Sequence, residues 1–366
     1  MNPDRVGSER FDELISAYLP ERIKLAIRGL KSEFLNELEE IRIRAGLPLM
    51  GVFSGYDRFI GSNGFLSDNL QFALIITAQE VKDLFYLLCE HSLYAYQEDI
   101  NRGFITLKGG HRAGICGTVV YEGDRIKAMR DISSVSIRLS RQLKGCAREV
   151  FHNIIRGRQD IYNTLILSPP RCGKTTLLRD LCRLISQGAG NDSFTGLRTA
   201  VVDERSELAA SFRGVPQNDL GPRTDILDGC RKSEGIELML RGMAPHVIVV
   251  DELGGPTDAA AVRMAWNGGV RLIATAHAFG LEDFKGRLGI GQLAAKDGFE
   301  RIILLGMNNG KRWTKVMDAN GNELNVLGQG TGLSHGFHRM HSSGDEAVEQ
   351  AGREAACTFK AHGHSP

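Results

Sequence analysis

The segment SPPRCGKTTLLRDLCRLI, residues 168–185, decides the fold of this chain. It follows the apolar run TLIL at 164–167 and continues into leucines and an isoleucine at helical spacing. A buried strand, a loop with Gly-Lys-Thr and an amphipathic helix, in this order, are the setting of a phosphate-binding loop. We therefore predict that the loop binds the phosphate groups of a nucleotide. The alternative is a chance Gly-Lys-Thr at a helix cap.

Each residue type in this loop has a chemical reason to be there. Gly173 lets the backbone curl so that successive N–H groups point at phosphate oxygens, and the helix N-terminus adds its positive end. We expect Lys174 to reach the β- and γ-phosphates of ATP and the Thr175 hydroxyl to ligate Mg²⁺. Ser168 stands where the usual pattern begins with glycine. The predicted nucleotide-binding residues are Ser168, Pro169, Pro170, Arg171, Cys172, Gly173, Lys174, Thr175 and Thr176.

A second motif, HVIVVDELGG at 246–255, ends an apolar strand in two carboxylates. At the carboxyl edge of a parallel sheet, such acids lie in the ligand crevice. We expect Asp251 to complete the Mg²⁺ shell with Thr175, and Glu252 to polarise the attacking water. An ordinary acidic turn after a strand is the alternative, and the phosphate loop upstream disfavours it.

Two further strand ends carry polar residues. In VVDERSE at 201–207, Asp203 and Glu204 are candidates for the same crevice, and Arg205 for binding phosphate or holding the acids. A surface cluster of ion pairs is an equal competitor for this segment. In IATAHAFG at 273–280, Thr275 and His277 are placed to sense the γ-phosphate. A lone histidine at a strand end is, however, more often structural.

Short apolar strands alternate with helical segments from about residue 146 to 328, which indicates an α/β domain with a parallel sheet covered on both faces. A helix is expected over 148–157, and hairpin turns at Asn309-Gly310 and Asn320-Gly321. The predicted strands are TLILS (164–168), TAVVDE (199–204), HVIVVDE (246–252), RLIATAH (271–277) and RIILLG (301–306).

Residues 1–145 read as a smaller α+β domain. Up to residue 100 the pattern is mainly helical, with one helix around 11–18 and another after the cap Thr77. Two short strands within 40–53 interrupt it, and strands with a hairpin turn at Gly123-Asp124 fill 103–141. Residues 329–366 lack periodicity, so we expect a disordered tail; its five histidines specify no metal geometry.

Composition limits the partners. Lys plus Arg is 45 and Asp plus Glu is 44, so bulk charge offers no attraction to nucleic acid, and we do not expect nucleic acid as a partner. Seven cysteines without a CxxC pair favour reduced thiols in a cytoplasmic protein. No apolar stretch approaches the roughly 18 residues of a membrane span. Membrane association would therefore depend on a partner protein or a surface patch.

The motifs CGKTTLLRD, VVDERSE, LDGCRKSEGIELMLRGMAPHVIVVDELG and ATAHA together resemble the stage III sporulation protein AA family, which is related to the type II and type IV pilus and secretion ATPases. The N-terminal pieces EEIRIRAGLPL, GFITLKGGHRAGICGTVV and SVSIRLSRQ resemble it too. The resemblance covers about residues 10–320. It implies a RecA-like P-loop ATPase domain behind an N-terminal domain, assembled as a hexameric ring.

The resemblance also implies roles for individual residues. Glu252 falls at the catalytic glutamate, Glu204 in the acidic segment and His277 in the histidine motif, and these three form the predicted catalytic set. Arginines supplied across a subunit boundary are implied as well, with Arg42, Arg44, Arg112 and Arg138 as the candidates. The implied setting is the mother-cell cytoplasm of a spore-forming bacterium, facing a membrane complex that reaches the forespore.

Three other functions compete with a ring ATPase that drives or gates a membrane complex. A nucleic-acid motor would use the same phosphate chemistry, but the chain has no run of Lys and Arg and no aromatic-basic strand pattern. A nucleotide-binding switch with little turnover is favoured by Ser168 alone. A small-molecule kinase would need an arginine-rich lid after the phosphate loop, and no such segment follows.

Overall fold

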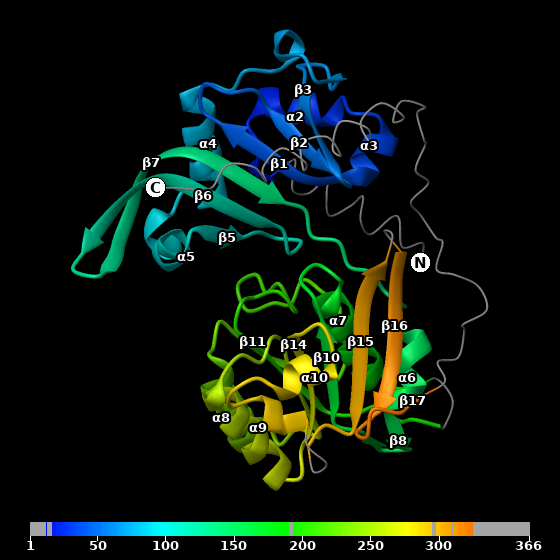
Figure 1. The fold of residues 1–366 in the computed structure, drawn as a ribbon. Coiled ribbons are helices and arrows are strands. Elements are labelled where there is room, and N and C mark those ends of the chain that lie inside the picture. Colours follow the sequence, from blue (N-terminus) through cyan, green and yellow to red (C-terminus); the bar gives the residue numbers. More distant parts are fainter. Residues whose placement is uncertain (1–11, 13–16, 190–192, 295–297, 309–310, 325–366) are drawn as a thin grey trace, which may run out of the picture. The chain divides into compact units, whose positions relative to one another are not determined.

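The computed structural model describes residue 12 and residues 17–189, 193–294, 298–308 and 311–324. Its first part, the N-terminal domain, is a mixed α+β layer built on an antiparallel sheet (Figure 1). In chain order its elements are α2 (Glu21–Arg28), α3 (Ser32–Glu37), β1 (Leu38–Arg44), β2 (Met50–Phe53), β3 (Tyr56–Ile60), β4 (Leu66–Ser67), η1 (Leu70–Phe72), α4 (Ala78–Leu88), η2 (Leu93–Tyr96), α5 (Gln97–Arg102), β5 (Phe104–Thr106), β6 (Arg112–Glu122) and β7 (Arg125–Arg138).

The strands of the N-terminal domain pair in the order β4-β3-β2-β1-β7-β6-β5. Their inward side chains and the apolar faces of α2 and α4 share one buried core, which includes Ile27, Ile41, Leu84 and Ile137. Helix α4 begins at a capping box: the Thr77 hydroxyl accepts the Glu80 N–H at 3.1 Å, and the Glu80 carboxylate accepts the Thr77 N–H at 2.8 Å.

The sequence predictions for this domain are confirmed in part. The cap at Thr77 and the hairpin turn at 123–124 are present, since Glu122 pairs with Arg125 across that turn. The two short strands predicted within 40–53 are present as β1 and β2, but the otherwise helical reading up to residue 100 was wrong about 56–67, which holds β3 and β4. Their short alternating stretches are too brief for periodicity to reveal them. The helix expected around 11–18 lies largely outside the described residues.

The second part, the α/β core, carries an eight-stranded sheet. Its elements are α6 (Arg148–Ile154), β8 (Ile155–Gly157), β9 (Asp160–Ile161), β10 (Thr164–Ser168), α7 (Lys174–Gln187), β11 (Thr199–Asp203), β12 (Thr224–Asp228), α8 (Lys232–Met243), β13 (Val247–Val250), α9 (Pro256–Asn267), β14 (Arg271–His277), α10 (Leu281–Lys285), η3 (Gly291–Ala294), β15 (Arg301–Asn308), β16 (Lys311–Asp318) and β17 (Glu323–Leu324).

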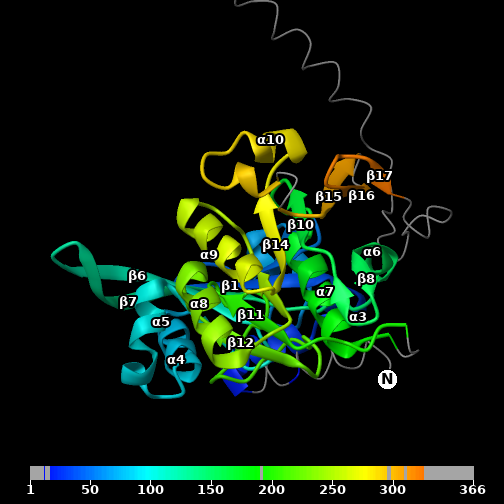
Figure 2. The same cartoon turned by 90° about the horizontal axis from the view of Figure 1, so that it is seen from below.

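The sheet of the core has helices on both faces (Figure 2). On one face Ile166, Val249 and Ile303 pack against the leucines of α7; on the other Leu165, Ile248 and Leu272 pack against α8 and α9. Adjacent residues of each strand thus serve opposite cores, which is why these strands read as continuous apolar runs. The prediction of a doubly covered sheet is confirmed.

The strand order is β12-β11-β13-β14-β10-β15-β16-β17, with parallel pairing from β12 to β15 and antiparallel pairing beyond. Strand β14 therefore separates β10, which leads into the Gly-Lys-Thr loop, from β13, which leads into Asp251 and Glu252. Because parallel strands end at one edge, the loops after β10, β14, β13 and β11 lie in a row there.

The predicted strands of the core are all present. Two predictions needed correction: the helix over 148–157 ends at Ile154 and a short strand follows it, and the sheet has an additional edge strand, β12. The turn residues Asn309 and Gly310 and the predicted tail at 329–366 lie outside the described residues. The domain limits 1–145 and 146–328 remain predictions. Among the described residues, no helix has the length and apolar content that crossing a membrane requires.

Candidate nucleotide site

The loop between β10 and α7 has the backbone that a phosphate cradle needs. Gly173 has φ 93° and Arg171 has φ 63°, both in the left-handed region. An L-residue such as Arg171 adopts this conformation at a cost of about 1–3 kcal/mol, and such outliers gather at functional sites. Helix α7 begins directly after Gly173 and carries no acidic residue in its first turn. The free N–H groups of that turn can therefore meet an anion without repulsion.

The Lys174 side chain is almost buried and folds back over its own loop. Its ammonium donates to the Ser168 carbonyl at 3.3 Å, to the Ser168 hydroxyl at 3.2 Å and to the Pro169 carbonyl at 3.2 Å. Burial lowers its pKa, against the attraction of Asp251. Ser168, which replaces the usual first glycine, thus supplies a hydroxyl that holds the lysine from within the loop.

Asp251 is tied to helix α7 and to strand β14. The Thr175 hydroxyl donates to Asp251 Oδ2 at 2.8 Å, and the hydroxyl of the buried Thr275 donates to Asp251 Oδ1. The same Thr275 hydroxyl accepts the N–H of Glu252 at 2.8 Å. One threonine on β14 therefore orients both acids that follow β13. Thr175 and Asp251, the two residues predicted to hold Mg²⁺, are in direct contact.

Glu252 lies at the centre of a chain of polar contacts. Its carboxylate forms an ion pair with Arg205 and approaches His277 Nε2 at 3.6 Å. His277 Nδ1 lies 3.0 Å from the Lys174 ammonium, which has protons to donate. Glu252 itself has φ 59°, a left-handed conformation that is costly for this residue type.

This chain of contacts, Arg205–Glu252–His277–Lys174, follows the order of the strands. Arg205 comes after β11, Glu252 after β13, His277 at the end of β14, and Lys174 after β10. Those four strands are consecutive neighbours in the sheet. The topology of the sheet, rather than closeness in sequence, brings together these four residues.

The segment 203–209, here called the acidic loop, is anchored by the buried Asp203. Its carboxylate accepts the backbone N–H groups of Glu207, Leu208 and Ala209 at 2.8–2.9 Å. Arg179 of α7 donates to the carbonyls of Glu207 and Leu208 at 2.6 and 2.9 Å. Burial raises the pKa of Asp203 to about 6 despite these hydrogen bonds. The Asp203 carboxylate therefore holds the backbone of the acidic loop, and both of its oxygens already accept hydrogen bonds.

Glu204, predicted as catalytic, forms an ion pair with Lys232 at the start of α8. Among the described residues no contact joins it to the phosphate loop, to Asp251 or to Glu252. Its catalytic role remains a prediction, whereas its observed position links the acidic loop to α8.

The four arginine candidates of the N-terminal domain differ in their surroundings. Arg42 and Arg138 both form ion pairs with Glu40, at 2.6 and 3.4 Å, and Arg44 contacts Met50. Arg112 instead reaches the acidic loop: its guanidinium donates to the Arg205 carbonyl at 2.5 Å and approaches the Glu207 carboxylate at 3.4 Å. Within one chain, Arg112 is therefore the candidate that contacts the segment next to the site.

Sequence reasoning missed one basic residue beside the loop. A methyl group built on Gly173 would lie 3.5 Å from Nη1 of Arg312, which belongs to β16. No motif surrounds Arg312, and it follows Lys174 by more than a hundred residues. Only the pairing of β15 and β16 beside β10 could have found it.

The residues present fit a nucleotide with Mg²⁺. Lys174, the N–H groups at the start of α7 and the small Gly173 suit a phosphate chain, and no carboxylate forms an ion pair with Lys174 among the described residues. Mg²⁺ typically takes one or two protein oxygens and completes its shell with water and phosphate. The Thr175–Asp251 pair meets that need, and no larger cluster of metal-binding side chains occurs in the described part of the chain.

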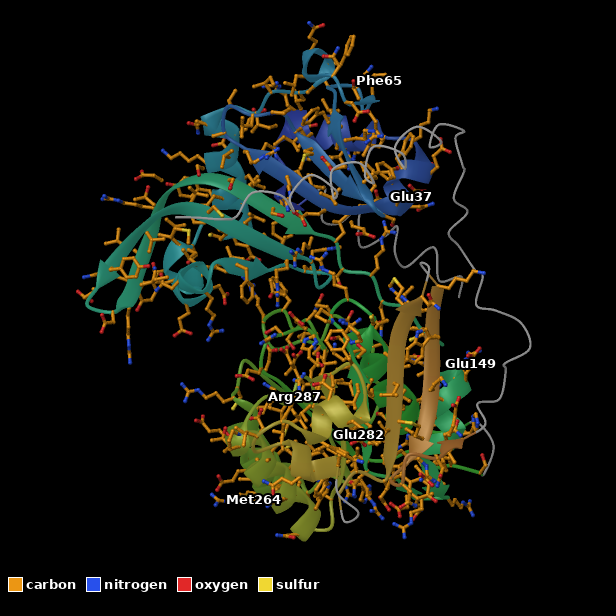
Figure 3. The ribbon with its side chains drawn as sticks, in the orientation of Figure 1. Glu37, Phe65, Glu149, Met264, Glu282 and Arg287 are labelled. Carbon is orange, nitrogen blue, oxygen red and sulfur yellow. The ribbon has the colours of Figure 1, made fainter. Side chains whose placement is uncertain are left out.

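An open pocket of about 440 Å³ lies elsewhere in the core. It is lined by residues near the C-terminal ends of α8 and α9, among them Leu240 and Met264. Figure 3 labels Met264. None of the predicted site residues lines it. We place the site at the strand ends because the convergent polar groups, and not the apolar hollow, match phosphate chemistry.

Comparison with solved structures identifies the fold. The X-ray structure of the ATPase DotB from Legionella pneumophila aligns with a TM-score of 0.50 and 15% identity over 81% of each chain. The pilus retraction motor PilT with bound ADP aligns with a TM-score of 0.51 and 14% identity, over 78% of this chain and 80% of that one. The fold is thus that of the secretion and pilus ATPases, with a RecA-like core.

Sequence comparison gives the family. The model of the family described as "Sporulation stage III, protein AA" matches residues 9–324, and the chain belongs to this family. Stage III sporulation protein AA of Bacillus subtilis is 36% identical over 320 residues, which are 87% of this chain and 98% of that protein. Protein SEEDLING PLASTID DEVELOPMENT 1 of Arabidopsis thaliana is 26% identical over 165 residues, covering 43% of this chain and 22% of that protein.

Proposed function

We propose that this protein is a Mg²⁺-dependent ATPase that works as a ring, with six subunits, and drives or gates a secretion-like membrane complex during sporulation. The observation that carries the proposal is the contact chain Arg205–Glu252–His277–Lys174 beside the Thr175–Asp251 pair. In it a lysine, a threonine–aspartate pair and a glutamate meet at one sheet edge, and we assign to them phosphate binding, metal binding and the role of base. Hydrolysis of a phosphoanhydride requires these three kinds of group together.

The residues divide the work as follows. Lys174 leaves its carbonyl partners and binds the phosphate chain, together with the N–H groups at the start of α7. Glu252 accepts the proton of a water that attacks the γ-phosphorus, and the bond to the leaving ADP oxygen breaks. His277 bridges these two residues and reports the state of one to the other. When bound, Mg²⁺ supplies positive charge that offsets the charge of the phosphates.

The membership of the sporulation family supports the setting, and the fold supports the mechanical role. The partners in this proposal are membrane proteins, with the ATPase recruited to the mother-cell side of the membrane through them. A second candidate, a nucleotide switch with little turnover of its own, is favoured by the ion pair between Arg205 and Glu252. That pair occupies the carboxylate that would activate water.

The test measures ATP hydrolysis per mole of protein over a wide range of protein concentration, together with ATP affinity and particle mass. In wild type we expect specific activity to rise as rings assemble. Glu252→Gln is isosteric and cannot accept the proton, so hydrolysis should fall by at least about a hundredfold while ATP binding and ring mass persist. The matched control is Glu237→Gln on α8, which forms an ion pair with Arg241 away from the site and should leave all three readouts unchanged.

Two results would count against the proposal. If specific activity stays constant while rings assemble, the ring is not required for hydrolysis. If Glu252→Gln hydrolyses ATP at the wild-type rate, Glu252 is not the base. ATP binding without turnover in wild type, even after assembly, would favour the switch instead.

A further inference from the structure

Arg312 lies on the face of β16 that points toward the phosphate loop. Side chains alternate along a strand, so Arg312 shares its face with Val316, which is fully buried in the same core as Leu177 and Leu178 of α7. The 3.5 Å separation between Arg312 Nη1 and a methyl group built on Gly173 agrees with this placement. The guanidinium therefore stands over the glycine that begins α7.

The hairpin of β15 and β16 reaches beyond the end of β10, which explains how a β16 side chain arrives there. Leu167, near the end of β10, pairs with Leu304, and β15 then continues to Asn308. Figure 1 shows the two strands, in orange, running side by side at this edge. Gly306 leaves space for the ring of Trp313 directly across the pair, so Trp313 occupies the opposite face from Arg312.

Among the described residues, the charge of Arg312 has no protein partner. No described residue forms a hydrogen bond or an ion pair with it, and its side chain is exposed. By contrast, Arg205 is already paired with Glu252. A fixed guanidinium beside an anion-binding loop, with no carboxylate to neutralise it, is suited to a phosphate oxygen because its planar fork donates two hydrogen bonds.

The order of the strands tells which end of the nucleotide it would meet. Glu252 and His277 lie on the β13 and β14 side of Lys174, whereas β15 and β16 lie on the other side. The hydrolysed γ-phosphate belongs with Glu252. We propose that Arg312 binds the α-phosphate end of the nucleotide, and so fixes the direction in which the phosphate chain lies across the loop. This inference rests on the proposed ATPase function.

The experiment compares the affinities of the full-length protein for ATP, ADP and inorganic tripolyphosphate, measured calorimetrically without turnover. Arg312→Ala should weaken ATP and ADP by the same factor, about tenfold or more, as expected for a charged hydrogen bond. Arg312→Lys keeps the charge and should give an intermediate loss. Lys311→Ala is the matched control. This substitution removes the same charge from the same hairpin, but Lys311 lies on the opposite face of β16 from Arg312.

The outcomes separate this inference from the function on which it rests. If wild type binds neither ATP nor ADP, the proposed function fails. If wild type binds both and Arg312→Ala binds them like Lys311→Ala, only the role of Arg312 is overturned. A loss for ATP without a loss for ADP would place Arg312 at the γ-phosphate and overturn the proposed direction. Tripolyphosphate should lose less affinity than ATP, since it has no nucleoside end to orient it.

Discussion

At the scale of single residues, Glu252 is the group whose surroundings decide what the site can do. Its left-handed backbone turns its carboxylate toward Arg205 on one side and His277 on the other. Thr275 fixes the Glu252 N–H, so the strained turn is held from the neighbouring strand. The carboxylate is well placed for catalysis, but a guanidinium already occupies one of its oxygens.

We predict that Arg205→Ala raises basal ATP hydrolysis with ATP affinity unchanged. Removing the guanidinium frees the Glu252 carboxylate to accept a proton from water. An exposed ion pair is worth up to about 1 kcal/mol, which corresponds to about a fivefold gain in rate. The measurement is single-turnover hydrolysis at saturating ATP. Arg231→Ala is the control, because Arg231 pairs with Glu234 away from the site. A loss of activity would instead show that Arg205 assists the reaction.

The sequence could predict the residues that motifs contain, and not those that topology alone supplies. Lys174, Thr175, Asp251, Thr275 and His277 follow strands or a glycine loop, so their convergence was predictable. The sequence could not decide whether Arg205 binds phosphate or holds an acid, because both need the same residue type. Arg312 was invisible, since its place depends on how far a hairpin extends beyond its neighbour.

At the scale of elements, the acidic loop shows how a buried charge can hold a backbone segment. Three N–H groups converge on Asp203, and Asp228 ends the neighbouring strand in register with it. Burial in this setting raises the pKa of Asp203 to about 6, from an ordinary 3.8. The folded protein therefore binds a proton there at pH values at which the unfolded chain has lost it.

We predict that this acid reduces stability as pH rises from about 4 to 6. The native state holds more protons than the unfolded state in this window, so the free energy of unfolding falls with pH and then levels off above it. Two pKa units correspond to at most about 3 kcal/mol. In urea unfolding across this range, the free energy of unfolding of wild type should fall relative to that of Asp203→Asn as pH rises.

Asp219→Asn is the control of opposite sign. Burial acts to raise the pKa of Asp219, but hydrogen bonds from Lys144 and the Gly221 N–H lower it overall. Its contribution to stability is therefore present above its unfolded pKa and is lost on acidification. If the free energy of unfolding of wild type instead rises with pH relative to that of Asp203→Asn, the site stabilises the ionised carboxylate and the prediction is wrong.

The elements themselves were predictable wherever burial was complete on both faces. Strands β10, β11, β13 and β14 are continuous apolar runs, and their predicted positions differ from the structure by at most two residues. Strand β12, TDILD, is half-exposed at the sheet edge and alternates with acids, so its sequence resembles a loop. Pairing with β11 supplies what its own residues lack, and pairing is not written in local sequence.

At the scale of the whole molecule, the N-terminal domain contacts the core through the segment that begins with the acidic loop. Besides Arg112, Gln142 exchanges two hydrogen bonds with the Asp219 backbone, and Lys144 forms an ion pair with the Asp219 carboxylate at 2.6 Å. The Gly109 N–H donates to Gln217. These contacts of the N-terminal domain lie within 205–219, the same segment that holds Arg205.

Arg112 is the residue that joins the two parts nearest the site. Its guanidinium donates a hydrogen bond to the Arg205 carbonyl, and its Cζ lies 4.2 Å from the centroid of the Phe104 ring. If it acts inside its own chain, it holds Arg205 against Glu252. We then expect Arg112→Ala to raise basal hydrolysis, by no more than Arg205→Ala does, with ATP affinity and ring mass unchanged. Arg112→Lys should lie between wild type and alanine.

The double variant tests the connection directly. Residues that act through one another are not additive, so Arg112→Ala with Arg205→Ala should match Arg205→Ala alone. An arginine that reaches a neighbouring subunit gives the reverse sign: its removal abolishes turnover because transition-state charge is left uncompensated. Arg138, whose side chain is 72% exposed, is the comparison for that behaviour. Loss of turnover in Arg112→Ala would therefore assign Arg112 to the neighbouring site and overturn its role within the chain.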